Sequence, residues 1–310
     1  MKATMAAELK VRLEQGESPV WEQSLHHPEQ IRLTWSDGVW GEAVEQPCFF
    51  HRLSAPVRLV ICGGGHVAQA LAAAASAVGF QITVLEDRPE VLEEGQFPPN
   101  AELRLGSVPE LLRTGKFPSN AFYAVMTRNH GGNRRCLREV MDLPHGYVGM
   151  LGSRRDAQGL RRWLVEDSVP EETVAGLHHP IGLSIGAETP AEIAVAVTAE
   201  LIQCRKSLVS GSALEQAVLD GLLKPPYAWV MLTDTQGITP RKPGAVMLVF
   251  PDGSICGTIG GGAREAAAIR QALEVLETGR AGCFTYPENG ALPTCGGIVT
   301  YTIVPVEEDN

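Results

Sequence analysis

The stretch VRLVICGGGHVAQALAAAASAVGFQITVLE, residues 57–86, decides the fold class of this 310-residue chain. It opens with an apolar run (57–62), passes through three consecutive glycines into an alanine-rich segment, and ends in a second apolar run (81–85). A strand, a glycine turn, a helix and a second strand within about 30 residues make a βαβ unit, in which the two strands are parallel. The stretch therefore predicts an α/β domain.

The same alternation continues toward the C-terminus. Further strands are expected near 103–105, 122–126 and 147–150, and helices over 108–114, 134–141 and 154–165. An extended segment, 178–185, is followed by a helix over 189–203, which Thr189 and Glu192 open as a capping box. This order predicts a Rossmann-like, doubly wound parallel sheet over residues 56–206.

The flanking sequences differ in style from this domain. Residues 1–55 combine a helix-like start with a hairpin (31–44) and a short strand (48–53), so we expect a small N-terminal β-rich segment. Residues 207–212 are small and polar and indicate a linker. The remaining residues, 213–310, predict a smaller α+β domain with strands at 229–233, 245–250, 254–259 and 298–304 and one helix at 263–277.

Composition excludes several classes of protein. Hydrophobic residues make up 44% of the chain, which excludes a disordered or fibrous protein. The net charge of −10 argues against general nucleic-acid binding, because an acidic surface repels phosphate backbones. Seven scattered cysteines without a CxxC pair favour reduced thiols. With no apolar leader in residues 1–20 and no membrane-spanning run, we expect a cytoplasmic protein that does not engage a membrane.

The first candidate site is the glycine turn of the βαβ unit. Gly63 and Gly65 let the backbone approach a pyrophosphate, the following helix offers free N–H groups, and Ala68 is small enough for close helix–strand packing. Glu86 lies 23 residues after Gly63, at the end of the second strand, where a carboxylate can bind ribose hydroxyls. These features predict a dinucleotide-type site; the alternative is a tight turn that binds nothing.

A second glycine run, Gly260 to Gly262, precedes the helix expected at 263–277. It places backbone donors at a helix N-terminus, which suits an anion, and Arg264 adds positive charge. A turn that only packing requires accounts for this sequence equally well.

Arginines follow two strands of the predicted sheet. Arg128 comes after the strand ending near 126, and Ser153 and Arg154 come after the strand 147–150. The carboxyl ends of parallel strands meet on the ligand side of the sheet, so these residues as a cluster favour anion binding. Any one of these arginines, taken alone, is better explained as a solvated surface residue.

Catalytic machinery is not evident in the sequence. The motifs GxSxG, HExxH, GxxxxGK[ST] and CxxC are absent, and His178 and His179 lack an identifiable third metal ligand. His66 follows the first glycine turn but has no visible orienting carboxylate. Cys295, flanked by glycines, is a candidate soft-metal ligand, although the residues alone favour a buried thiol.

Together these motifs resemble those of one protein family. The segments RLVICGGGHVAQAL (58–71), ITVLEDRPE (82–90), VMTRNH (125–130), YVGMLGSRRD (147–156) and HHPIGLSIGAETPAEIAVAVTAEL (178–201) resemble the Rossmann domain of XdhC-type accessory proteins. The segments ITPRKPGAVMLV (238–249), GTIGGGAREAA (257–267) and TCGGIVTYTIVPV (294–306) are similar to the companion XdhC/CoxI domain. The residues that match the family pattern are Gly63, Gly65, His66, Glu86, Arg241, Pro243, Gly244, Gly260, Gly261, Gly262 and Cys295.

The resemblance implies a role as well as a fold. Members of the family bind the molybdenum cofactor, protect it and help deliver it to molybdenum hydroxylases such as xanthine dehydrogenase. A cysteine desulfurase partner is implied, because the cofactor receives a terminal sulfur before insertion. We therefore expect a chaperone for this cofactor, in its molybdopterin or dinucleotide form, that is not itself an enzyme. The expected cofactor-binding residues are Gly63, Gly64, Gly65, His66, Glu86, Asp87, Arg128, Ser153, Arg154, Arg241, Gly260, Gly261, Gly262 and Cys295, with Cys295 also as a metal ligand.

Two departures from the family pattern stand out. The CoxI-type domain usually precedes the Rossmann domain, whereas here it follows. The second glycine run is commonly followed by cysteine, whereas this chain has Ala263. The reversed order makes an intertwined homodimer plausible.

Two other functions remain open. An NAD(P)-dependent oxidoreductase explains Gly63, Gly65 and Glu86 equally well but leaves the second glycine run and the Cys295 segment unexplained. An interaction scaffold with a vestigial Rossmann site is the third interpretation, and nucleotide binding separates it from the other two.

Overall fold

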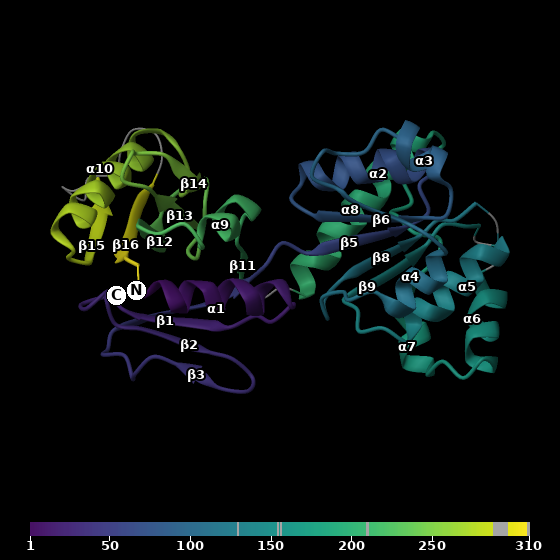
Figure 1. Ribbon diagram of the computed structural model, residues 1–310, viewed down its shortest axis with the longest axis horizontal. Coiled ribbons are helices and arrows are strands. Elements are labelled where there is room, and N and C mark those ends of the chain that lie inside the picture. The colour runs from purple at the N-terminus through teal and green to yellow at the C-terminus, as the bar shows by residue number, and fades with distance from the viewer. Residues whose placement is uncertain (129, 154, 156, 209–210, 288–296, 309–310) are drawn as a thin grey trace. The chain divides into compact units, whose positions relative to one another are not determined.

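The computed structural model describes every residue except 129, 154, 156, 209–210, 288–296 and 309–310. The chain divides into two compact units (Figure 1): unit 1 contains Met1–Ala55 and Ser210–Asn310, and unit 2 contains Pro56–Val209. Among the described residues, no helix has the length and apolar character needed to cross a membrane.

Unit 2 is built on a six-stranded parallel sheet, as the sequence predicts. Its strands run in the order β10-β9-β8-β5-β6-β7. Because the order turns back on either side of β5, a crevice is expected where β5 lies next to β8, at the carboxyl ends of the strands. The strands are β5 (Arg58–Cys62), β6 (Gln81–Glu86), β7 (Glu102–Leu105), β8 (Phe122–Val125), β9 (Tyr147–Met150) and β10 (Leu177–His178).

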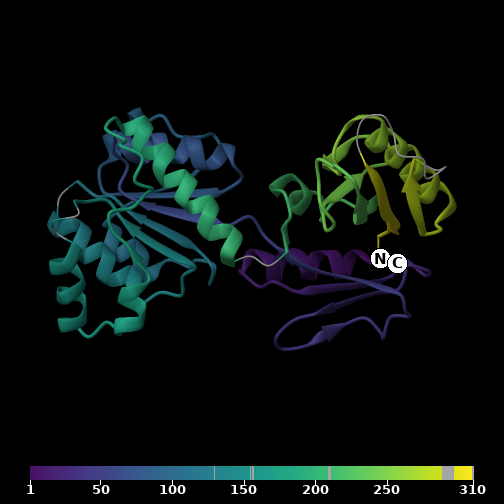
Figure 2. The ribbon, with the colours of Figure 1, turned by 180° about the vertical axis from the view of Figure 1, so that it is seen from behind.

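Helices cover both faces of this sheet (Figures 1 and 2). Side chains alternate along β5, so that Leu59 and Ile61 pack against one layer of helices while Val60 and Cys62 pack against the other. The first layer contains α2 (His66–Ala77) and α8 (Pro190–Leu208), and the second α4 (Val108–Thr114), α5 (His130–Met141) and α6 (Ala157–Glu166). Two short helices, α3 (Pro89–Glu94) and α7 (Glu171–Ala175), complete the unit.

Unit 1 contains two sheets that come from distant parts of the chain. The first runs in the order β11-β4-β1-β2-β3 and the second, fully antiparallel, in the order β14-β13-β12-β16-β15. Their strands are β1 (Val20–Ser24), β2 (Ile31–Thr34), β3 (Val39–Trp40), β4 (Cys48–Ser54), β11 (Ser212–Ala213), β12 (Tyr227–Gln236), β13 (Val246–Val249), β14 (Ile255–Gly257), β15 (Gly282–Tyr286) and β16 (Ile298–Val306). The helices are α1 (Ala3–Glu14), α9 (Gln216–Gly221) and α10 (Gly262–Thr278).

A shared core joins the N-terminal and C-terminal parts of unit 1. The rings of Trp21 in β1 and Trp229 in β12 stack with centroids 5.0 Å apart and planes 10° from parallel, and both side chains are fully buried. The buried amide oxygen of Gln23 accepts hydrogen bonds from the Trp21 indole (3.2 Å) and from the hydroxyl of Thr302 (2.9 Å). Residues 1–55 therefore fold together with the C-terminal part of the chain.

Candidate functional site

The glycine turn of unit 2 requires glycine at its first position. Gly63 has φ +109°, and a Cβ atom added there would lie 2.6 Å from the carbonyl oxygen of Met126. Its N–H group donates to the carbonyl oxygen of Leu85 (2.8 Å), which ties the turn to β6. Ala68 is buried in the core between α2 and the sheet. The turn thus has the close backbone packing that the sequence predicts.

The N-terminus of α2 is open at this turn. Gly65 is the N-cap residue, and among the described residues no side chain caps the helix. A Cβ atom added at Gly65 would meet no atom within 4 Å, so the space in front of the helix is free of described protein atoms. The first N–H groups of a helix and its dipole together favour an anion in such a place.

Glu86 occupies a different position from the one expected of a ribose ligand. Its carboxylate accepts hydrogen bonds from the backbone N–H of Gly64 (2.6 Å) and from the guanidinium of Arg88 (2.9 Å to each of two oxygens). Burial raises the pKa of Glu86, but these hydrogen bonds outweigh it and bring the pKa to about 2. Glu86 is therefore an ionised residue that holds the turn from inside the protein.

Beside the turn lies a cavity of about 130 Å³. It brings together three of the predicted residues, Gly63, Asp87 and Arg128. The sequence analysis missed Ser107, Thr127 and Arg135, which also line it. The only available signal was their position just after β7, just after β8 and in α5, because loops at the carboxyl ends of neighbouring strands converge.

Asn133 fixes one wall of this cavity. Its side-chain oxygen accepts hydrogen bonds from the backbone N–H (2.7 Å) and the hydroxyl (2.8 Å) of Thr127. The segment after β8 is thereby held to α5, and Arg128 follows it directly. His66 is exposed and does not line the cavity.

The loop after β9 is packed against His179. A Cβ atom added at Gly152 would lie 2.3 Å from Cε1 of His179. The Nδ1 atom of His179 lies 3.0 Å from the carbonyl oxygen of Met150, an acceptor that fixes the proton on Nδ1. Ser153 follows in this loop but does not line the 130 Å³ cavity, and Arg154 lies outside the described residues.

In unit 1, the predicted residues gather at one edge of the antiparallel sheet. The strand register places the ends of β12, β14 and β15 beside the beginnings of β13 and β16. Arg241 lies between β12 and β13, and Gly260 to Gly262 lie between β14 and α10. Gly297 precedes β16 at the same edge, whereas Cys295 lies outside the described residues.

Glu265 holds the second glycine run in shape. Its carboxylate accepts hydrogen bonds from the hydroxyl of Thr258 and from the backbone N–H groups of Ile259 (3.1 Å) and Gly261 (3.2 Å). Gly261 and Gly262 have φ of +68° and +67°, and added Cβ atoms there would meet nothing within 4 Å. The run is therefore an open backbone loop at the start of α10.

Two arginines flank this loop. A Cβ atom added at Gly260 would lie 3.6 Å from Cγ of Arg241 and 3.7 Å from Cδ of Arg264. Arg241 is paired with Glu215 at 2.6 Å, whereas Nη1 of Arg264 is buried and has no hydrogen-bond partner among the described residues. A buried guanidinium N–H without an acceptor is costly, and an anion at the loop would satisfy it.

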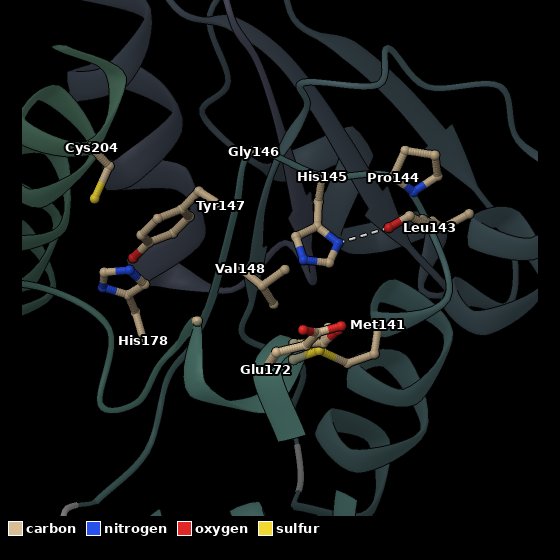
Figure 3. A pocket seen from close by; sticks show the side chains of 12 residues that line it. Met141, Leu143, Pro144, His145, Gly146, Tyr147, Val148, Glu172, His178 and Cys204 are labelled. Carbon is tan, nitrogen blue, oxygen red and sulfur yellow. Dashed lines mark hydrogen bonds between the residues drawn. The ribbon is translucent and has the colours of Figure 1, made fainter. Parts of the chain in front are cut away.

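A second cavity, of about 670 Å³, lies where β9 begins, at the opposite end of the sheet from the glycine turn (Figure 3). Tyr147, His178 and Cys204 line it. The carboxylate of Glu200 accepts hydrogen bonds from the hydroxyl of Tyr147 (2.6 Å) and the backbone N–H of Gly182 (2.7 Å), and lies 3.0 Å from Nδ1 of His178. The sequence analysis missed this network, whose members are far apart in the chain.

The network around Glu200 is expected to stabilise unit 2 in a pH-dependent way. Burial raises the pKa of Glu200, but hydrogen bonds from His178, Tyr147 and Gly182 lower it overall. Such a group contributes stability above its unfolded pKa and loses it as the pH falls through the lower folded value. We expect Glu200→Gln to cost about 1–3 kcal/mol in the free energy of unfolding at pH 7, and the difference to shrink below about pH 4.

Scanning calorimetry of both proteins at pH 7 and pH 3.5 checks this expectation. Glu166→Gln is the control, because Glu166 is an exposed carboxylate in the same unit. An unchanged difference between Glu200→Gln and the unmodified chain at the two pH values would contradict it.

The fold and the glycine turn define a Rossmann-type anion-binding protein with a second glycine-loop domain. The XdhC Rossmann domain model matches residues 59–201, and the XdhC and CoxI family model matches residues 223–287. Together the two models match more than half of the chain. The chain belongs to the XdhC and CoxI family.

Several known proteins are similar to parts of this chain. "Uncharacterized protein YqeB" of Escherichia coli is 39% identical over 155 residues, or 50% of this chain and 28% of that protein. A Bacillus subtilis protein named as a probable subunit of xanthine dehydrogenase is 31% identical over 158 residues, or 51% and 46%. "Molybdenum cofactor insertion chaperone PaoD" of E. coli is 40% identical over 79 residues, or 24% of each chain. The matched regions thus span less than half the length of these curated relatives.

A solved structure gives the same picture of the fold. The crystal structure of a xanthine dehydrogenase from Bacillus halodurans matches with a TM-score of 0.54 and 25% identity. The match covers 67% of this chain and 65% of that chain.

Proposed function

We propose that this protein is a molybdenum cofactor chaperone that assists maturation of a xanthine dehydrogenase-type molybdenum hydroxylase. Its membership of the XdhC and CoxI family supports this role, as does its similarity to a relative named for molybdenum cofactor insertion. The observation that carries the proposal is the pair of open glycine loops at helix N-termini, one in each unit. Both loops suit an anionic ligand, and the cofactor carries a phosphate.

The described residues fit the anionic part of the cofactor better than its metal. Open helix N-termini and arginines suit a phosphate or a nucleotide diphosphate. Among the described residues, no group of three histidine, cysteine or acidic side chains is arranged to hold a metal ion. Cys295 remains the proposed contact to the metal or its sulfur, and Arg154 a proposed contact to the anion. The recipient hydroxylase uses the cofactor's redox chemistry, so this chain's task is to bind and release it.

Partners follow from this role. The proposal includes a recipient hydroxylase and a cysteine desulfurase that supplies the terminal sulfur, and it places the protein in the cytoplasm. A homodimer is also part of the proposal.

Molybdenum retention tests the function directly. The protein is incubated anaerobically with sulfurated molybdenum cofactor and desalted, and molybdenum and pterin are then quantified per chain. Near-stoichiometric retention of both is expected. Binding of NAD(H) without retention of molybdenum or pterin would overturn the proposal and favour the alternative, an NAD(P)-dependent oxidoreductase. Cys295→Ala that retained sulfurated cofactor as well as the parent would remove the role of this thiol.

Arg264 offers a sharper test of the second loop. We expect Arg264→Gln to reduce retained cofactor about tenfold or more, because a charge-assisted hydrogen bond to an anion contributes roughly 1.5–3 kcal/mol. Thermal unfolding should change little, since Arg264 Nη1 has no partner among the described residues to lose. Arg270→Gln, an exposed arginine on the same helix, is the matched control. Equal retention by the two variants would exclude Arg264 from the site.

A further inference from the structure

The carboxylate of Glu86 has no capacity left for a ligand. One oxygen accepts from Gly64 N–H (2.6 Å) and Arg88 Nη2 (2.9 Å). The other accepts from Arg88 Nε (2.9 Å) and from the backbone N–H groups of Asp87 (3.0 Å) and Arg88 (3.2 Å). A carboxylate offers about four lone-pair sites, so these five donors saturate it. Glu86 is also only 2% exposed, which leaves no path for a sugar hydroxyl to reach it.

Glu86 instead determines the conformation of the glycine turn. Its bond to Gly64 fixes the middle peptide of the turn, and a Cβ atom added at Gly64 would lie 3.2 Å from the same carboxylate oxygen. The bidentate pair with Arg88 fixes the carboxylate in turn. The open N–H groups at the start of α2 follow this turn directly.

Asp87 has the opposite character. Its side chain is 67% exposed, and it lines the 130 Å³ cavity together with Gly63, Arg128 and Arg135. The Nε atom of Arg88 lies 3.9 Å from its carboxylate, beyond hydrogen-bonding distance, so the Asp87 oxygens are available to donors from a ligand. The cavity therefore presents one acceptor carboxylate beside the turn and two guanidinium groups.

The carboxylate of Glu86 is also the neighbour that most affects Asp87. Its side-chain contact with Glu86 raises the pKa of Asp87, because two ionised carboxylates repel each other. A hydroxyl donor from a ligand would offset this repulsion by stabilising the ionised form of Asp87.

We infer that Asp87 reads the sugar hydroxyls of a nucleoside diphosphate bound at the glycine turn, and that Glu86 is a positioning residue that never contacts this ligand. The inference deepens the proposed function and rests on it, because it assigns a nucleotide tail to the ligand held by unit 2. Arg128 and Arg135 supply positive charge beside the diphosphate, and Asp87 accepts from the ribose.

Removing a hydroxyl from the ligand and a carboxylate from the protein separates the two roles. Calorimetric titrations measure the binding of ADP, GDP and CDP to the full chain, and then of the 2′-deoxy and 3′-deoxy forms of the tightest binder. Asp87→Ala should weaken ribonucleotide binding about tenfold or more, and at least one deoxy form should bind the unmodified chain correspondingly weakly. The variant and that deoxy form together should show no further loss, because both remove the same hydrogen bond.

Glu86 should give the contrary pattern. Glu86→Ala should weaken ribo and deoxy ligands by the same factor, and Glu86→Gln, which keeps an acceptor for Gly64, should recover part of the loss. Glu90→Ala is the control for Asp87→Ala, because Glu90 is a nearby exposed carboxylate that does not line the cavity. Since Asp87 is exposed, its variant is expected to fold, and the Asp87 cycle alone decides the assignment even if the Glu86 variants are unstable.

Three results would overturn the inference. Additive losses for Asp87→Ala and the deoxy ligands would remove Asp87 from the sugar. Coupling between Glu86→Gln and a deoxy ligand would make Glu86 the contact instead. Absence of diphosphate binding up to millimolar concentration would remove the nucleotide tail, while molybdenum retention, measured separately, would still decide the proposed function.

Discussion

Replacing Trp21 with alanine is expected to lower the free energy of unfolding of unit 1 by about 3–5 kcal/mol, the cost of removing a large aromatic side chain from a packed core. The indole is fully buried, stacks on Trp229 at 5.0 Å and donates a hydrogen bond to Gln23. Because these contacts join β1 to β12, the loss should affect the whole of unit 1. Scanning calorimetry should show one transition moving to lower temperature while the transition of unit 2 stays in place.

Val39→Ala is the control for this substitution. Val39 belongs to β3 in the same unit and is half exposed, so its truncation should change the unfolding temperature little. A Trp21→Ala protein that unfolds like the Val39→Ala protein would show that residues 1–55 do not share a core with the C-terminal part of the chain.

The second large effect is expected at Gly63. Gly63→Ala should destabilise unit 2 by about 2–4 kcal/mol, combining a left-handed backbone cost of about 1–2 kcal/mol with overpacking of similar size. The new methyl group would lie 2.6 Å from the carbonyl oxygen of Met126, so β5 and the segment after β8 would have to separate. Chemical denaturation, followed by circular dichroism, measures this loss.

Gly65→Ala should behave in the opposite way. Gly65 has φ −66°, which alanine adopts without strain, and its added Cβ atom meets nothing within 4 Å. The protein should therefore keep its stability, while the methyl group occupies the space through which an anion reaches the first turn of α2. Unchanged binding of nucleoside diphosphate by Gly65→Ala would place the ligand elsewhere.

The central part of unit 2 could be predicted from the sequence because its signals are local. The strand before Gly63, the helix after Gly65 and the strand ending at Glu86 follow one another within 29 residues, Arg58–Glu86, and each has a distinct pattern. The sequence places this helix at 66–78, and the structure places it at His66–Ala77. Parallel pairing then follows from the short crossover.

The composition of unit 1 could not be predicted in this way. β1 was missed, because Val20–Ser24 is short and its buried positions gain their meaning only from partners such as Thr302, 279 residues away from Gln23. The β15 strand, Gly282–Tyr286, was missed for a similar reason, since it is an edge strand with few buried residues. Long-range pairing has no signature in a single sequence window.

The candidate site was predicted in its location but not in the roles of its residues. Spacing identified Glu86 as a carboxylate at the end of the second strand, yet spacing cannot show that Arg88 and Gly64 saturate it. Asp87, its neighbour, faces the cavity because successive residues leaving a strand point in different directions. The network of Tyr147, His178 and Glu200 depends on the packing of α8 on the sheet, which no local motif encodes.

The interrupted course of unit 1 has a consequence for biosynthesis. Residues 1–55 leave the ribosome first, but β12 and β16, against which they pack, are translated only after the whole of unit 2. At about 5–20 residues per second, this interval is roughly ten to thirty seconds. During that time Trp21 and Leu33 lack the partners that bury them, whereas unit 2 is already complete in the nascent chain. The newly made protein therefore depends on protection of its N-terminal segment while synthesis continues.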